Sequence, residues 1–169
     1  MTRTMRSVMV CGAVGAMSVL TACGGPSKKA YETQVVFDET LKGQTVEVDL
    51  IPVMNEADLT QLAGCEVNDY FKAGSSLRKD WAGRGRTLTF TQGSSTTFQI
   101  SRDEAMWKEK PSHIVIMANI PGMSDQKGPS DRRRLPISTL SDVWEGDKLD
   151  IMVQRSGLKI TTPQKPKKN

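Results

Sequence analysis

The stretch Ser112-His113-Ile114-Val115-Ile116-Met117-Ala118-Asn119-Ile120 decides the fold. It is nearly all apolar, and Pro111 stands immediately before it. A short, continuous apolar run of this kind is typical of a strand that lies inside a sheet. The sequence therefore predicts a central strand over residues 112–120, with further strands on both sides of it.

The rest of the chain shows mostly the two-residue period of half-buried strands. Apolar side chains at Val46, Val48 and Leu50 alternate with Glu47 and Asp49, and similar runs recur along the chain. We expect the runs on either side of Gly93-Ser94-Ser95 to form one hairpin, and those around Ser156-Gly157 to form a closing one. The strands predicted from these runs cover residues 31–37, 46–53, 86–92, 98–100, 149–153 and 158–162.

Two short helices interrupt the strands. Asn55 is a good cap for a helix that ends at Gly64. Ser101 and Glu104 have the spacing of a capping box, which predicts a second helical turn ending at Trp107. Seven or eight strands with so little helix argue against a crossover α/β fold and predict the mainly β class, an antiparallel β-sandwich with one or two short helices.

The first 22 residues have the features of a secretory signal peptide. Arg3 and Arg6 give a positive start, and the apolar segment Ser7–Leu20 is 14 residues long. A membrane-spanning helix needs about 20 residues, so this segment is too short to span a bilayer. Removal of residues 1–22 from the 169 leaves a mature chain of 147 residues, the size of one domain.

The tetrad Leu20-Thr21-Ala22-Cys23 resembles the lipobox of bacterial lipoproteins. In that class the cysteine becomes the first mature residue and carries acyl chains, so we expect lipidation at Cys23. Ordinary cleavage near Ala22, with Cys23 left as a thiol, is the alternative. Gly24 stands where an Asp tends to retain such proteins at the inner membrane, which favours the outer membrane. The expected organisation is a lipidated tether over 23–30, a sandwich over 31–162 and a disordered basic tail over 163–169.

Composition excludes several classes of function. One His and three Cys in the whole chain are too few for a zinc module. Loss of Arg3 and Arg6 lowers the formal charge from +4 to +2, which gives no footprint for nucleic acid. No phosphate-binding loop or metal-ligand spacing is present, so we expect no cofactor and no metal. Cys65 is the one thiol left after lipidation: a small buried residue, or a thiol that pairs with a partner.

Catalysis finds little support in the sequence. His113 is the only histidine, and no Gly-x-Ser-x-Gly elbow supplies a nucleophile for it. Acidic pairs occur around Asp103 and Asp142, and a hydrolase would need two such groups facing each other. A helix start and a loop are the simpler interpretations of these acids. We therefore expect a protein that is not an enzyme, with a hydrolase using Asp103 or Asp142 as the outside hypothesis.

Two segments are candidate partner-binding surfaces. The segment Pro121–Arg134 is long for a connection and ends in Arg132, Arg133 and Arg134, whose planar groups suit carboxylates. Its alternative is a solvated loop. Trp81 stands among cations between Lys79 and Arg86, either as a binding residue or as a lid on the core. The run Asp69–Arg78 is distinctive, but no mechanism follows from it.

Taken together, the chain resembles the small outer-membrane lipoprotein of type VI secretion systems, the TssJ family. The lipobox, the Val-Asp-Leu of 48–50, the strand 114–120 with its Arg-containing loop and Leu135-Pro136-Ile137, and the closing hairpin 148–162 carry the resemblance. It implies a transthyretin-like sandwich that holds the periplasmic part of an inner-membrane partner, TssM, without catalysis. The Asp69–Arg78 run and the length of the loop after the central strand depart from the family's pattern.

Two functions therefore compete. The first is a scaffold in an envelope-spanning secretion complex, anchored in the outer membrane by acyl chains and facing the periplasm. The second is a lipoprotein that binds cell-wall glycan or a small ligand, suggested by Trp81 and Trp144 among polar loops.

Overall fold

A computed structural model describes residues 26–123, 126 and 130–166. The predicted signal peptide and Cys23 lie outside the described residues. Within them, no helix is both long enough and apolar enough to cross a membrane. The elements follow one another as β1 (Glu32–Phe37), η1 (Glu39–Leu41), β2 (Val46–Val53), α1 (Glu56–Gly64), α2 (Val67–Phe71), α3 (Ser76–Ala82), β3 (Arg86–Phe90), β4 (Thr97–Ile100), α4 (Ala105–Lys108), β5 (His113–Asn119), β6 (Arg134–Ser138), β7 (Lys148–Gln154) and β8 (Gly157–Ile160).

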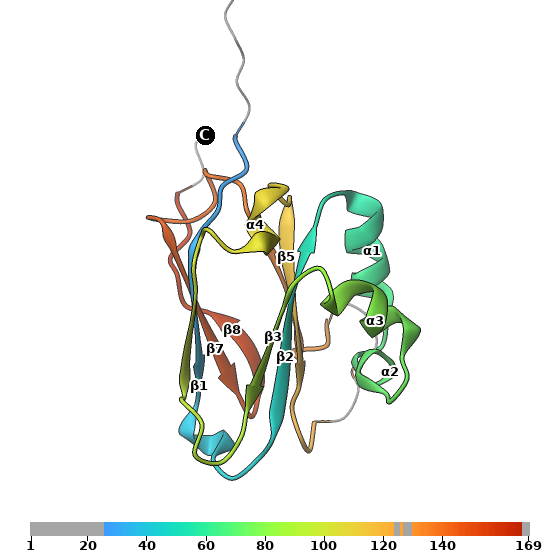
Figure 1. Cartoon of the computed structure of the whole chain (residues 1–169). Coiled ribbons are helices and arrows are strands. Elements are labelled where there is room, and N and C mark those ends of the chain that lie inside the picture. Colours follow the sequence, from blue (N-terminus) through green and yellow to red (C-terminus); the bar gives the residue numbers. More distant parts are fainter. Residues whose placement is uncertain (1–25, 124–125, 127–129, 167–169) are drawn as a thin grey trace, which may run out of the picture.

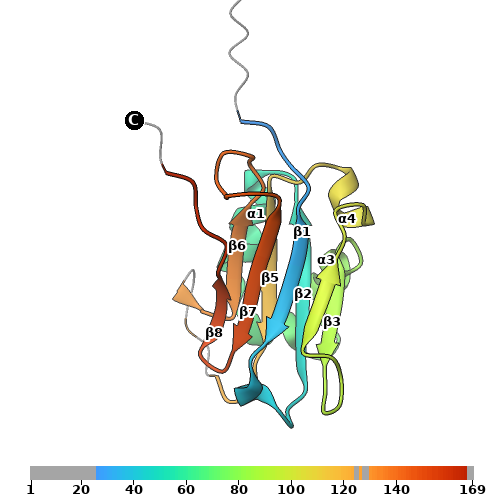
Figure 2. The same cartoon turned by 90° about the vertical axis from the view of Figure 1, so that its left-hand side faces the viewer.

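The strands form two four-stranded sheets, with the orders β4-β1-β7-β8 and β3-β2-β5-β6. The two sheets face each other as a sandwich, which confirms the predicted fold class (Figure 1 and Figure 2). The pairing is not antiparallel throughout, because β1 and β7 run parallel over six residue pairs. The closing hairpin of β7 and β8 is confirmed, with Gln154 opposite Gly157.

The other predicted hairpin is wrong. Strand β3 pairs with β2 and strand β4 pairs with β1, so the turn at Gly93 carries the chain from one sheet to the other. Aromatic packing explains this crossing: the ring of Phe37 stacks on Phe90 at 4.8 Å between centroids and meets Phe98 edge-on at 5.6 Å. The alternating pattern found both strands, but cannot tell a ladder within one sheet from contact between two sheets.

Strands β2 and β5 are buried on both faces and lie in the interior of their sheet. Val48 and Leu50 face the core between the sheets, whereas Ile51 and Val53 face a second core under the helices. In β5, the core between the sheets takes Ile114, Ile116 and Ala118, and the second core takes Val115 and Met117. The continuous apolar run of the central strand therefore serves two cores at once.

Helices α1, α2 and α3 cover the outer face of β2 and β5 (Figure 1). The predicted cap of α1 is confirmed, because the side chain of Asn55 accepts a hydrogen bond of 2.9 Å from the Asp58 amide. Helices α2 and α3 occupy the distinctive run of residues 69–78 and were not foreseen. Helix α4 follows Glu104, which makes no side-chain cap, so the predicted capping box that starts at Ser101 is wrong.

Both ends of the described chain dock on the same end of the sandwich (Figure 1). The Lys29 amide donates to the Thr139 carbonyl at 2.9 Å, and Lys28 bridges to Leu140. At the other terminus, the Lys165 amide donates to Val143 at 2.9 Å, beside a bridge between residues 144 and 164. The prediction of a disordered tail from residue 163 is therefore wrong for 163–165; residues 167–169 lie outside the described part.

Candidate functional site

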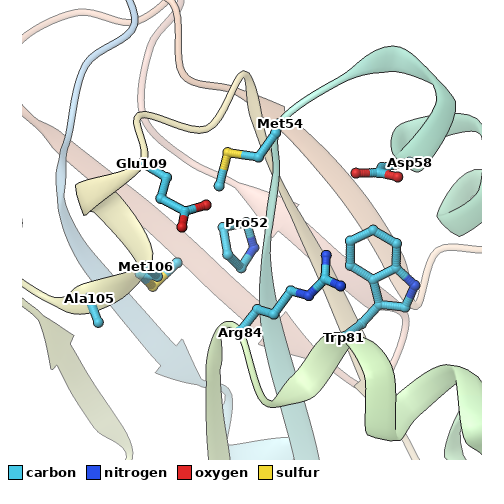
Figure 3. A pocket seen from close by; sticks show the side chains of 8 residues that line it. All are labelled: Pro52, Met54, Asp58, Trp81, Arg84, Ala105, Met106 and Glu109. Carbon is cyan, nitrogen blue, oxygen red and sulfur yellow. The ribbon is translucent and has the colours of Figure 1, made fainter.

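A cavity of about 340 Å³ opens between α4 and the helical layer, which consists of α1, α2 and α3, at the end of β2 (Figure 3). Its apolar lining comes from Pro52, Met54 and Met106, and Trp81 of α3 forms one wall. Its charged groups come from three different segments: Asp58 of α1, Arg84 after α3 and Glu109 after α4. The cavity thus joins residues that are distant from one another in the chain.

Arg84 gives this cavity its polarity. Its guanidinium lies 4.9 Å from the centre of the Trp81 ring, and Figure 3 shows it pointing into the space between Trp81 and Pro52. In the part of the chain that the structure describes, Arg84 forms no ion pair. Asp58 accepts a hydrogen bond of 3.0 Å from the Asn55 side chain at the start of α1. The lining offers apolar walls with charges of both signs, which suits a ligand that carries both apolar and charged groups.

Trp81 is 6% exposed, so the structure places this predicted partner-binding residue in the second core, with Arg84 over its ring. Trp144 is also buried, and its indole N–H donates to the Ser138 carbonyl at 2.7 Å. Neither ring lies open on the surface as a platform for a sugar. The interpretation of Trp81 as a lid on the core fits these positions.

A buried carboxylate fastens the helical layer to the sheet. Asp49 of β2 is 1% exposed and accepts hydrogen bonds from Tyr70 at 3.0 Å, Arg78 Nε at 2.8 Å and Thr87 at 2.7 Å. Burial and the neighbouring Asp49 raise the pKa of the Tyr70 hydroxyl. Arg78 also reaches Glu47 at 3.1 Å. The two carboxylates Glu47 and Asp49, on one face of this strand, are the signal in the sequence that a polar cluster faces this side.

The three adjacent arginines do not form a common exposed surface. Arg133 is 1% exposed, and its Nη2 lies 2.7 Å from a carboxylate oxygen of Asp131, which is equally buried. Its Nη1 donates to Asn68 at 2.6 Å. Burial on its own would raise the pKa of Asp131, but the hydrogen bonds and charge of Arg133 outweigh it and hold that pKa below its usual range.

Arg134 is also buried and lies at the end of α1. Its Nη1 donates to the carbonyls of Leu62 at 2.9 Å and Cys65 at 2.6 Å, a position in which a cation satisfies the last carbonyls of a helix. Burial raises the pKa of the Cys65 thiol, and the nearby Arg134 offsets part of that rise. Of the three arginines, only Arg132 is exposed. The expectation that all three face a partner is therefore wrong for Arg133 and Arg134.

The catalytic candidates are not assembled into a reactive group. The Ser112 hydroxyl donates to the Val53 carbonyl at 3.0 Å, so it does not give its proton to His113, whose Nδ1 lies 3.3 Å away. Asp103 and Asp142 are exposed on two different loops. Among the residues that the structure describes, no three His, Cys, Asp or Glu side chains are grouped as a metal site.

Comparison with known proteins gives structural matches alone. No protein-family model matches the sequence, and no curated protein does. Among solved structures, the chain is similar to Lip of Serratia marcescens, described as a membrane bound component of the type VI secretion system, at 12% identity and a TM-score of 0.46, over 78% of this chain and 98% of that one. It is also similar to the T6SS lipoprotein TssJ1 of Pseudomonas aeruginosa, at 13% identity and a TM-score of 0.48, over 84% of this chain and 100% of that one.

Proposed function

We propose that this protein is a membrane-anchored lipoprotein without enzymatic activity, which holds a protein partner in an envelope-spanning complex of the type VI secretion kind. The observation that carries the proposal is the docking of the chain that follows the lipobox. Ser27 and Ser141 are joined by a backbone hydrogen bond of 2.9 Å and by contact of their hydroxyls at 3.3 Å. Lys29 continues this contact through an ion pair with Asp147.

The docked segment limits how far the body can move from a lipid on Cys23. Ser27 is four residues after Cys23, and an extended chain spans at most about 3.6 Å per residue. Acyl chains on Cys23 would thus hold the body within about 14 Å of the bilayer surface. Two or more acyl chains anchor a protein stably, so this short tether would keep the tethered end of the body close to the bilayer.

The position of the tether bears on which surfaces a partner can reach. The end that carries the docked tether would face the membrane, and the end with the connections that follow β1 and β3 would point away from it (Figure 1). The helical layer would stand to the side. A partner that approaches through the periplasm would meet the far end and the helical layer first. Gly24 after Cys23 supports the outer membrane as the anchoring membrane.

The absence of catalysis in this proposal is supported by the geometry of the only histidine, because Ser112 donates its proton elsewhere. Binding of a small ligand in the cavity of Figure 3 is the second candidate, since its volume of about 340 Å³ falls in the range of ligand sites. Retention of the purified protein on insoluble peptidoglycan would favour this second candidate in its cell-wall form.

The anchor is tested by fractionation of cells that express Cys23→Ser. We expect this variant in the soluble periplasmic fraction with an unchanged unfolding midpoint. Cys65→Ser is the matched control, because it removes the other cysteine of the predicted mature chain, and it should stay with the membranes. Membrane association of Cys23→Ser equal to that of the control would contradict the anchor.

The scaffold role is tested by affinity purification of the tagged wild-type protein from detergent-solubilised membranes. We expect an inner-membrane protein with a large periplasmic domain to co-purify in a stoichiometric amount. The same purification from cells with Cys23→Ser should recover much less of it, since the variant is no longer held at the membrane. Repeated recovery of the lipoprotein alone would overturn the scaffold role and leave the anchor untouched.

A further inference from the structure

A second hollow, of about 400 Å³, lies between α2 and α3 and is lined by cations. Lys72, Arg78 and Lys79 all contribute to its lining, whereas no carboxylate does. We call it the α2–α3 groove. Helices α2 and α3 and the loop between them carry most of its lining and include the distinctive run of residues 69–78, to which the proposed function assigns no role. These helices lie on the outer flank of the sheet that holds β2 and β5, away from the docked tether (Figure 1).

Two of these cations are available to a ligand. Lys72 and Lys79 are exposed, and within the described ranges neither side chain is part of an ion pair. Arg78 is different, because Asp49 and Glu47 hold its guanidinium against the sheet. The Arg78 charge is therefore largely neutralised by the fold, and the charge offered to a ligand is that of the two lysines.

The rest of the groove leaves room for a peptide backbone. Four lining residues, Ala73, Gly74, Ala82 and Gly83, have no side chain larger than a methyl group. Gly74 has φ = +80°, and the space where a side chain would stand is open. On the other side, the ring of Phe71 packs against Arg78 at 4.7 Å and gives the groove a fixed apolar wall.

From these features we propose that the α2–α3 groove binds an acidic peptide segment, with carboxylates of the segment paired to Lys72 and Lys79. The proposal rests on the proposed function in that the occupant belongs to a protein partner, and it adds the chemistry of that partner. Asp69 and Asp80 are exposed on the same two helices but are not part of the lining.

The test is a binding measurement with the full-length protein in non-ionic detergent. Its probes are two fluorescein-labelled hexapeptides, one of glutamate and one of glutamine, followed by fluorescence anisotropy. We expect the glutamate peptide to bind and the glutamine peptide to bind at least tenfold more weakly. Raising the salt concentration should lower the affinity for the glutamate peptide, because exposed charges are screened. Equal binding of both peptides, or binding of neither, would overturn the proposal.

Charge-reversal variants locate the site. We expect Lys72→Glu combined with Lys79→Glu to weaken the glutamate peptide at least tenfold. The matched control combines Lys42→Glu with Lys159→Glu, which makes the same change in net charge at exposed lysines outside the helical layer, one after η1 and one in β8 of the other sheet. It should stay within about twofold of wild type. Equal loss in both double variants would show a general charge effect and overturn the site; an unchanged thermal midpoint checks that each variant is folded.

Two further arms separate an acidic peptide from other anions. Inorganic phosphate and vesicles that contain phosphatidylglycerol are titrated into the same complex. The proposal is supported if phosphate displaces the peptide no better than a simple salt at the same ionic strength. Binding to the vesicles through Lys72 and Lys79, without peptide binding, would assign the groove to lipid headgroups instead. If the glutamate peptide does not bind but a protein partner is still recovered from membranes, the groove proposal is refuted and the scaffold role is unaffected.

Discussion

Replacement of Asp131 by asparagine is the sharpest test of how the helical layer is held. The substitution removes the charge that balances Arg133 while the shape changes little. Both residues are 1% exposed, so solvent cannot replace the lost partner. Breaking a buried ion pair by removing one partner costs about 3–5 kcal/mol, because the other charge stays buried and uncompensated. The new side-chain amide would also turn an N–H toward the guanidinium, which has only donors.

The measurement is urea unfolding followed by tryptophan fluorescence, since Trp81, Trp107 and Trp144 are all buried. For a denaturant slope of about 2 kcal/mol/M, a loss of about 3–5 kcal/mol lowers the midpoint by about 2 M. The exposed pair of Arg102 and Glu32 supplies the control, and Glu32→Gln should leave the midpoint nearly unchanged. A midpoint for Asp131→Asn as close to wild type as that of the control would refute the reasoning.

Acid provides a second readout of the same pair. The pKa of Asp131 is lowered in the folded protein, so its contribution to stability is complete above the ordinary pKa of about 4. That contribution is lost as the pH falls through the lowered folded value. The difference in unfolding free energy between wild type and Asp131→Asn should therefore be largest near neutral pH and shrink below about pH 4. A difference that stays constant into acid would contradict the assigned charge state.

Three further outcomes follow from local geometry. Gly157→Ala should lower the free energy of unfolding in urea by more than about 2 kcal/mol, because φ is +122° and a side-chain carbon would lie 2.5 Å from Arg132 Cβ. Gly74→Ala, at φ = +80° in open space, is the control and should lower it by about 1 kcal/mol. Equal losses in the two variants would contradict the clash at Gly157. Asp49→Asn should loosen α2 and α3 from the sheet. Relative to wild type, hydrogen exchange should become faster in residues 67–82 and change little in β5; an equal increase in both would contradict a local role. The Cys65 thiol, whose pKa is raised by burial, should react with iodoacetamide at about pH 8 more slowly in the folded protein than in urea, and equal rates would contradict its position.

The sheet strands could be predicted from the sequence because their cause is local. Alternation in residues 46–50 and the apolar run at 112–120 show which side chains of each strand are buried, whichever strand it pairs with. The parallel pairing of β1 with β7 could not be predicted, since it joins residues more than a hundred positions apart. The crossing of the chain between sheets at Gly93 depends on the same kind of distant contact.

The helical layer shows the opposite case. Helices α2 and α3 are five and seven residues long, too short to hold themselves by their own hydrogen bonds. Their stability comes from Tyr70 and Trp81 in the second core and from Arg78 on Asp49. None of these contacts leaves a periodic pattern in so short a segment. The run was recognisable as distinctive, but its structure is a product of tertiary packing.

The arginines explain why residue type alone misplaced the candidate surface. Arg133 and Arg134 are of a type that binding surfaces favour, yet here they join the helical layer to the rest of the fold, through Asn68 of α2 and through the carbonyls at the end of α1. The α2–α3 groove is carried by that same layer. Substitution of either buried arginine is therefore expected to weaken binding to the proposed groove by displacing the layer that carries it. Substitution of Lys79, which belongs to the proposed contact, should instead lower the affinity for the glutamate peptide with an unchanged unfolding midpoint. That difference separates a binding surface from the structure that supports it.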